Sequence, residues 1–163
     1  MTFNNSKKVA FLKKFPDIEF DSETCNHAAR SKFNFSYFDH TQPAGQNFED
    51  WTIDQLAKLL DKLKEFGKFP LSHWMNQRCG AGGLKVLEVY GGFPRRSNFD
   101  HPKHIPKNVR WARFRLEGDM RLIGFIVPAE LENKISKRSG IVFDSNVFYV
   151  VFLDQFHKFY ISS

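Results

Sequence analysis

The sequence has few cysteines and no long apolar run. Only two of its 163 residues are cysteines, Cys25 and Cys79, too few for a disulfide framework or a four-thiolate zinc site. No apolar run approaches the ~18 residues of a membrane-spanning helix. Lys7 and Lys8 are followed by no apolar segment with a small-residue cleavage site, so we expect no secretory signal. These absences favour a cytoplasmic protein without a membrane span.

Motifs for metal binding, cofactor binding and acid pairs are also missing. His101 and His104 lie on either side of Pro102 and lack a third ligand, so no metal site is expected. The glycines between residues 80 and 83 precede an expected strand, whereas a phosphate-binding glycine loop follows a strand and opens a helix. We therefore expect no cofactor. The acidic residues near the expected strands form no recognisable catalytic pair: Glu88, Glu117, Asp119 and Asp154.

Positive charge and phenylalanine are what the sequence has in excess. Lysine and arginine outnumber aspartate and glutamate by 24 to 18, which gives a formal charge of +6. This balance favours an anionic partner, most often a nucleic acid. Phenylalanine occurs 19 times, and aromatic residues make up 16% of the chain. Most of these rings are expected to fill a core, while others would offer stacking surfaces for bases.

The apolar pattern predicts a single α+β domain. A helix is expected over residues 53–66, because Thr52 and Gln55 form a capping box and apolar residues follow at steps of three and four. Shorter helices are expected over 71–77 and 129–138, and strands over 33–37, 84–90, 109–116, 121–127 and 148–153. We expect a mostly antiparallel twisted sheet with a helical hairpin on one face, after an N-terminal extension of about 50 residues.

The expected hairpin around residues 111–121 is the most informative segment. Strand alternation places Trp111, Arg113 and Arg115 on one face. Such a face can grip a phosphate and stack on a base, or it can be a solvated face whose arginine stems cover the sheet. The position of Arg121 depends on the turn. A two-residue loop at Gly118-Asp119 would place it on the core side, whereas a three-residue loop over 117–119 would pair it with Arg115. Gly118 at the first loop position favours the two-residue loop, and the sequence leaves the choice open.

The end of the last expected strand carries His157, Lys158 and Tyr160. A histidine with a pKa near neutrality can act as a general acid or base, and a tyrosine can orient a substrate. The same residues can also form a polar cap where the strand leaves the core. The sequence leaves these two interpretations open.

The order of these parts resembles the RelE/ParE toxin superfamily, and within it the RelE and YoeB ribonuclease branch. That branch has a hairpin with Trp, basic residues, a polar turn and Arg-Leu. Here the hairpin runs from Trp111 to Leu116, turns at Glu117-Gly118-Asp119, and continues with Arg121-Leu122. The branch ends near a His-Tyr pair, and this chain ends with His157-Lys158-Phe159-Tyr160. The resemblance covers about residues 53–160, which would form a RelE-like core.

The resemblance implies an enzyme that cleaves mRNA without a metal ion, often on the ribosome, through attack by the RNA 2′-hydroxyl. His157 would be the general base or acid, and Arg121 would stabilise the transition state. Arg113 and Arg115 would position the phosphate, which Tyr160 would orient.

RNA binding is expected to involve further residues and partners. Lys58 and Lys62 would attract RNA without sequence preference. Trp111 would stack on a base, and Lys158, next to His157, would also contact the RNA. In this interpretation the partners are RNA and the ribosome, with an acidic antitoxin protein covering the basic face.

Two other functions fit the same residues. The chain would be a nucleic-acid-binding or ribosome-binding module without catalysis, or a ParE-like protein that grips a protein target. The N-terminal extension would either add its 33–37 strand to the edge of the sheet or cover the active face, and the sequence does not decide between these arrangements.

Overall fold

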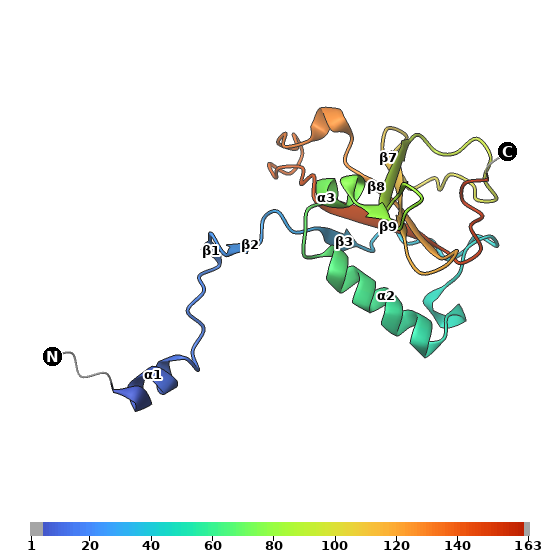
Figure 1. Cartoon of the computed structure of the whole chain (residues 1–163). Coiled ribbons are helices and arrows are strands. Elements are labelled where there is room, and N and C mark those ends of the chain that lie inside the picture. The colour runs from blue at the N-terminus through green and yellow to red at the C-terminus, as the bar shows by residue number, and fades with distance from the viewer. Residues whose placement is uncertain (1–4, 162–163) are drawn as a thin grey trace.

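A five-stranded sheet forms the centre of the fold. The computed structural model describes residues 5–161, and its main sheet has the order β3-β9-β8-β7-β6. Only the β3–β9 pair is parallel. Figure 1 shows the sheet with helix α2 (Ile53–Phe66) lying across one side. This arrangement confirms the predicted α+β domain with a mostly antiparallel sheet. The strands are β3 (Lys32–Asn34), β6 (Leu87–Gly91), β7 (Arg110–Arg115), β8 (Arg121–Ile126) and β9 (Val147–Asp154).

Apart from the main sheet and the two helices that cover it, the elements are short. They comprise helix α1 (Ser6–Leu12), the hairpin of β1 (Asp21–Ser22) with β2 (Cys25–Asn26), and the hairpin of β4 (Arg78–Cys79) with β5 (Leu84–Lys85). Two 3-10 helices span Phe48–Asp50 and Ala129–Leu131. The second of these replaces the helix expected over 129–138, and the strand expected over 84–90 divides into β5 and β6. Among residues 5–161, no helix is long and apolar enough to cross a membrane.

Helices cover one face of the sheet, as the sequence predicts. Helix α2 (Ile53–Phe66) begins with the expected capping box: the Thr52 hydroxyl accepts from the Gln55 amide at 3.2 Å, and the Gln55 side chain accepts from the Thr52 amide at 2.9 Å. Helix α3 (Leu71–Asn76) follows. Their buried side chains pack against the sheet and form what we call the first core: Leu59, Phe66, Leu71 and Trp74 with Leu87, Ala112, Phe114, Leu122, Phe148, Val150 and Leu153.

Loops, rather than helices, cover the opposite face. The proline-containing segment between β6 and β7 supplies Phe99, Ile105 and Val109, and the segment after β9 supplies Phe159. These side chains pack on the sheet and form the second core with Trp111, Ile123, Phe125, Val151 and Phe152. The loops cover only the apolar part of this face. The end of the face nearest the β7–β8 turn carries charged residues instead.

The N-terminal extension joins the edge of the sheet. Phe33 in β3 pairs with Phe148 in β9 and packs on the first core. The strand stops at Asn34, whose side chain accepts from the Ser36 amide at 2.9 Å and turns the chain. Tyr37 then packs on the second core. The strand expected over 33–37 is therefore shorter than predicted, because this turn ends it at Asn34.

Gly124 in β8 gives a test of how closely the sheet and its cores pack. A β-carbon at this position would contact the Tyr149 carbonyl oxygen and approach Phe148 Cε1 to 2.6 Å. We expect Gly124→Ala to lower the free energy of unfolding by about 3 kcal/mol, since the obstruction includes backbone that cannot move without shifting β9. Urea denaturation measures the loss. Gly82→Ala, where a β-carbon meets nothing within 4 Å, is the control, and equal stability of the two variants would contradict this packing.

Candidate active site

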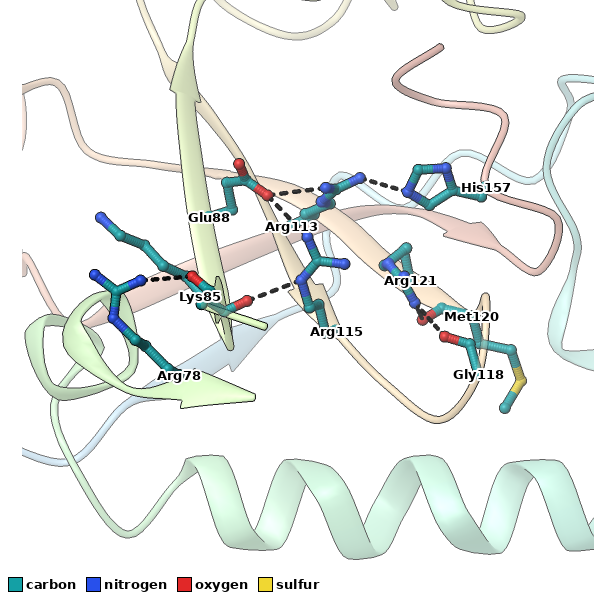
Figure 2. Close-up of polar contacts among 10 residues, drawn as sticks. Arg78, Lys85, Glu88, Arg113, Arg115, Gly118, Met120, Arg121 and His157 are labelled. Carbon is teal, nitrogen blue, oxygen red and sulfur yellow. Dashed lines mark hydrogen bonds and ion pairs between the residues drawn. The ribbon is translucent and has the colours of Figure 1, made fainter. Parts of the chain in front are cut away.

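The β7–β8 hairpin brings three arginines to one end of the second face. Arg115 pairs directly with Arg121, and Leu116 and Met120 extend the ladder by one hydrogen bond of 3.1 Å. The turn is therefore the three-residue loop 117–119, the alternative that places Arg121 beside Arg115. Arg113 lies two residues along β7 on the same face (Figure 2). Arg113 and Arg121 are buried, with 6% and 7% of their surfaces exposed.

Glu88 in β6 neutralises part of this charge. It lies opposite Arg113 in the ladder, and its Oε2 atom accepts from Arg113 Nη2 at 2.8 Å and from Arg115 Nη2 at 3.2 Å. Arg115 Nε also donates to the Lys85 carbonyl at 2.9 Å. One carboxylate therefore serves two arginines, as Figure 2 shows. Glu88 retains 37% side-chain exposure while Arg113 and Arg115 retain 8% and 9%, so it lies at the solvent side of the cluster.

Asp154 positions His157 in the turn after β9. The Asp154 carboxylate is 1% exposed and accepts from the backbone amides of Lys158 at 2.9 Å and Phe159 at 2.8 Å. These bonds fold the chain back on itself. His157 has a φ of 56°, a left-handed conformation that residues other than glycine adopt only when their surroundings impose it. The turn directs the imidazole toward β7.

His157 makes a direct hydrogen bond with Arg113. The distance between Arg113 Nη1 and His157 Nε2 is 2.7 Å. A guanidinium has only donors, so Nε2 must accept, and the imidazole is neutral with its proton on Nδ1. Burial lowers the pKa of His157, and the charges of Arg113 and Arg121 lower it further, while Asp154 opposes them. Arg113 thus donates through Nη2 to the Glu88 carboxylate and through Nη1 to the His157 imidazole.

The arginines are not fully satisfied by their neighbours. Arg121 Nη1 donates to the carbonyls of Gly118 at 2.7 Å and Met120 at 2.8 Å. The Nε atoms of Arg113 and Arg121 are buried and have no partner. Burial, followed by the charges of Arg115 and Arg113, lowers the pKa of the Arg121 guanidinium. An anion bound beside these guanidinium groups would relieve this repulsion.

Two stacked tyrosines border the cluster. The Arg113 guanidinium lies over the Tyr90 ring, 5.3 Å from its centroid. Tyr160 stacks on Tyr90 with 5.0 Å between ring centroids and 3° between planes. The Tyr90 hydroxyl is buried without a hydrogen-bond partner, and burial raises its pKa. Tyr160, the tyrosine expected at the site, therefore stacks on Tyr90, and Tyr90 in turn lies against Arg113.

The structure gathers some of the residues singled out in the sequence and separates others. Arg113, Arg115, Arg121 and His157 come together in what we call the arginine cluster. Trp111 does not join them as a stacking surface: it is 1% exposed and packs against Phe93 and Phe125. The prediction of an open Trp111 ring is therefore wrong, because the loop between β6 and β7 covers it.

The candidate lysines lie outside the cluster. Lys58 and Lys62 belong to α2, where they pair with Glu117 at 3.0 Å and Glu65 at 3.1 Å. Lys62 nevertheless shares a groove of about 410 Å³ with Arg115. Lys158 extends its Nζ over the Phe156 ring, 5.3 Å from the centroid.

Three important residues were not assigned roles from the sequence: Glu88, Tyr90 and Asp154. The signal for Glu88 and Tyr90 was their alternation along β6, which places both on the face that carries Arg113. No periodic pattern pointed to Asp154, because its role is to accept hydrogen bonds from two backbone amides. Among residues 5–161, no three histidine, cysteine or acidic side chains gather where they could hold a metal ion.

Comparisons of the chain with protein-family models, curated proteins and solved structures find no match. The resemblance to the RelE/ParE superfamily therefore stays a prediction, and the site is interpreted from its own geometry.

The neighbours of His157 predict its titration. We expect its pKa to lie below the ordinary 6.5 and to rise in Arg113→Met, because that change removes a nearby positive charge but keeps an apolar stem. NMR titration of the His157 ring protons in both proteins tests this. His40, which is exposed, provides an internal reference. An unchanged His157 pKa in Arg113→Met would contradict the contact.

Asp154 is expected to support both the turn and the imidazole. In Asp154→Asn, one amide would face an NH₂ donor in place of an oxygen, so we expect a loss of about 1–3 kcal/mol in the free energy of unfolding. The pKa of His157 should also fall further, because Asp154 is the charge that raises it. Asp100→Asn, at an exposed position, is the matched control. Wild-type stability and titration in Asp154→Asn would show that the carboxylate does not hold the turn.

Proposed function

We propose that this protein is an endoribonuclease that cleaves RNA by metal-independent attack of the 2′-hydroxyl. The observation that carries the proposal is the contact of Arg113 with Glu88 through one terminal nitrogen and with His157 through the other. A phosphate bound by Arg113 would then have a carboxylate on one side and an imidazole on the other. In-line displacement at phosphorus requires a base and an acid placed in this way.

The arginines supply the electrostatic part of the mechanism. A phosphodiester carries one negative charge, and more charge develops on its oxygens in the transition state. Arg113 and Arg121 are buried, so their interactions with that charge are screened less than at an exposed surface. Arg115 shares Glu88 with Arg113 and adds to the positive field.

Glu88 and His157 would divide the proton transfers. The Glu88 carboxylate takes the proton from the 2′-hydroxyl as its oxygen bonds to phosphorus. The bond from phosphorus to the 5′-oxygen breaks, and protonated His157 gives its proton to that oxygen. The products are a 2′,3′-cyclic phosphate and a 5′-hydroxyl. His157 is neutral in the free protein, and a bound phosphate would offset the arginine charges that lower its pKa. On protonation its Nε2 becomes a donor, so it would release Arg113 Nη1 and donate to the 5′-oxygen instead.

The resemblance to the RelE and YoeB branch adds expectations about substrate and partners. It favours mRNA, including mRNA on the ribosome, and an acidic antitoxin that would cover the arginine cluster. The alternatives are a module that binds nucleic acid without cleaving it and a ParE-like grip on a protein target. Clustered arginines serve all three functions, whereas a carboxylate and an imidazole on one arginine favour catalysis.

Cleavage of a defined RNA by the purified full chain tests the proposal. We expect the wild type to cut RNA in EDTA, with or without ribosomes, leaving 2′,3′-cyclic phosphate ends and sparing DNA of the same sequence. Glu88→Gln and His157→Ala should each reduce the rate by about 10²-fold or more, because each removes one proton-transfer group. Arg113→Ala should cost at least about 10²-fold as well.

Matched variants separate catalysis from general effects. Glu49→Gln and His40→Ala change the same residue types at exposed positions away from the cluster and should cleave as the wild type does. Intact RNA at high protein concentration, free and on ribosomes, would overturn the proposal. RNA binding that survives His157→Ala but is lost in Arg113→Ala, without cleavage by any variant, would favour the noncatalytic module.

A further inference from the structure

A groove adjoins the arginine cluster on the side of the stacked tyrosines. It has a volume of about 570 Å³ and is lined mainly by Tyr90, Phe93, Arg95, Arg96, Tyr160 and Ile161. These residues come from two segments, the end of β6 with the loop that follows and the last described residues of the chain. The groove therefore has aromatic surfaces and two cationic side chains.

Backbone hydrogen bonds hold the two segments together. The Ile161 amide donates to the Arg96 carbonyl at 3.1 Å, and the Asn98 amide donates to the Lys158 carbonyl at 3.0 Å. The Tyr90–Tyr160 stack adds a side-chain contact between the same segments. The groove is thus formed before any ligand arrives, which reduces the entropy lost on binding.

Tyr90 lies between the groove and the arginine cluster. Its ring lines the groove and also lies under the Arg113 guanidinium. A ligand in the groove would therefore lie one aromatic ring from the phosphate expected at Arg113. That separation suits neighbouring nucleotides of one strand better than two independent ligands.

The arginines at the groove are free to bind a phosphate. Arg95 and Arg96 are exposed, and among residues 5–161 neither has a carboxylate within ion-pair distance. Tyr160 keeps 42% of its surface exposed although it stacks on Tyr90. An aromatic face beside unpaired arginines is the combination that binds a base together with its phosphate in single-stranded nucleic acids.

We infer that this groove is a second nucleotide-binding subsite for single-stranded RNA. The base stacks on Tyr160 and the adjoining phosphate contacts Arg95 and Arg96, while the scissile phosphate lies at Arg113. The inference rests on the proposed function for the identity of the strand. It assigns Tyr160 to substrate binding through its ring rather than to chemistry through its hydroxyl.

Binding of a fluorescent DNA hexamer by the full chain tests the subsite without cleavage, because DNA lacks the 2′-hydroxyl. We expect Tyr160→Ala, and separately the double variant Arg95→Ala/Arg96→Ala, to weaken binding by about tenfold. Tyr160→Phe keeps the ring and should bind as the wild type does. The double variant Lys103→Ala/Lys107→Ala removes two exposed charges from the same loop outside the groove and should change binding less than twofold.

Chain length provides a second measurement. A dinucleotide has one phosphate, which would lie at Arg113 and leave none for Arg95 and Arg96, so the Arg95→Ala/Arg96→Ala variant should bind it as the wild type does. Equal weakening in the lysine control, or hexamer binding unaffected by the groove variants, would overturn the subsite.

The outcomes separate the subsite from the proposed catalysis. If the wild type cleaves RNA but the groove variants bind and cleave normally, only the subsite fails. If no RNA is cleaved but the groove variants lose hexamer binding, the subsite stands and the catalytic proposal fails. A loss of RNA cleavage in Tyr160→Phe with normal hexamer binding would return Tyr160 to the chemical role and overturn its assignment here.

Discussion

A guanidinium buried on a sheet face must find acceptors, and here three guanidinium groups share the end of one face. Their positions follow from the three-residue turn, which pairs Arg115 with Arg121. Like charges placed opposite each other in a sheet destabilise it. Glu88 offsets part of that cost by accepting from Arg113 and Arg115. The carbonyls of the turn accept from Arg121.

The local parts of this arrangement could be predicted from the sequence. The capping box at Thr52 set the start of α2, and apolar alternation located β7 and β8. The turn was less certain, because Gly118 at the first loop position favoured the two-residue loop, whereas the structure has the three-residue loop with Gly118 in a left-handed conformation, φ 57°. Only pairing with the rest of the sheet decides the register of the hairpin. The candidate arginines were therefore identified, but their mutual positions were not.

Long-range contacts explain what the sequence could not give. Trp111 alternates with Arg113 and looked exposed, yet a loop that begins some twenty residues earlier covers it. Glu88 had no acidic partner in the sequence, and its partners are arginines on a neighbouring strand. Asp154 acts through two amides a few residues on, a contact that no periodic pattern marks. Side-chain type and spacing thus identified the candidate residues. Whether each of them is buried or exposed depends on the loop that lies over its strand.

The β7–β8 hairpin also has a consequence for how the protein folds. Hairpin contacts are local and form quickly, whereas Glu88 reaches the arginines only after a long loop is closed, and β9 must join before Asp154 and His157 arrive. The three positive charges therefore meet before the groups that balance them. Inorganic phosphate or sulfate bound between the arginines would remove that repulsion at the earliest stage. The folding rate, and not only the final stability, would then depend on the anion present in the buffer.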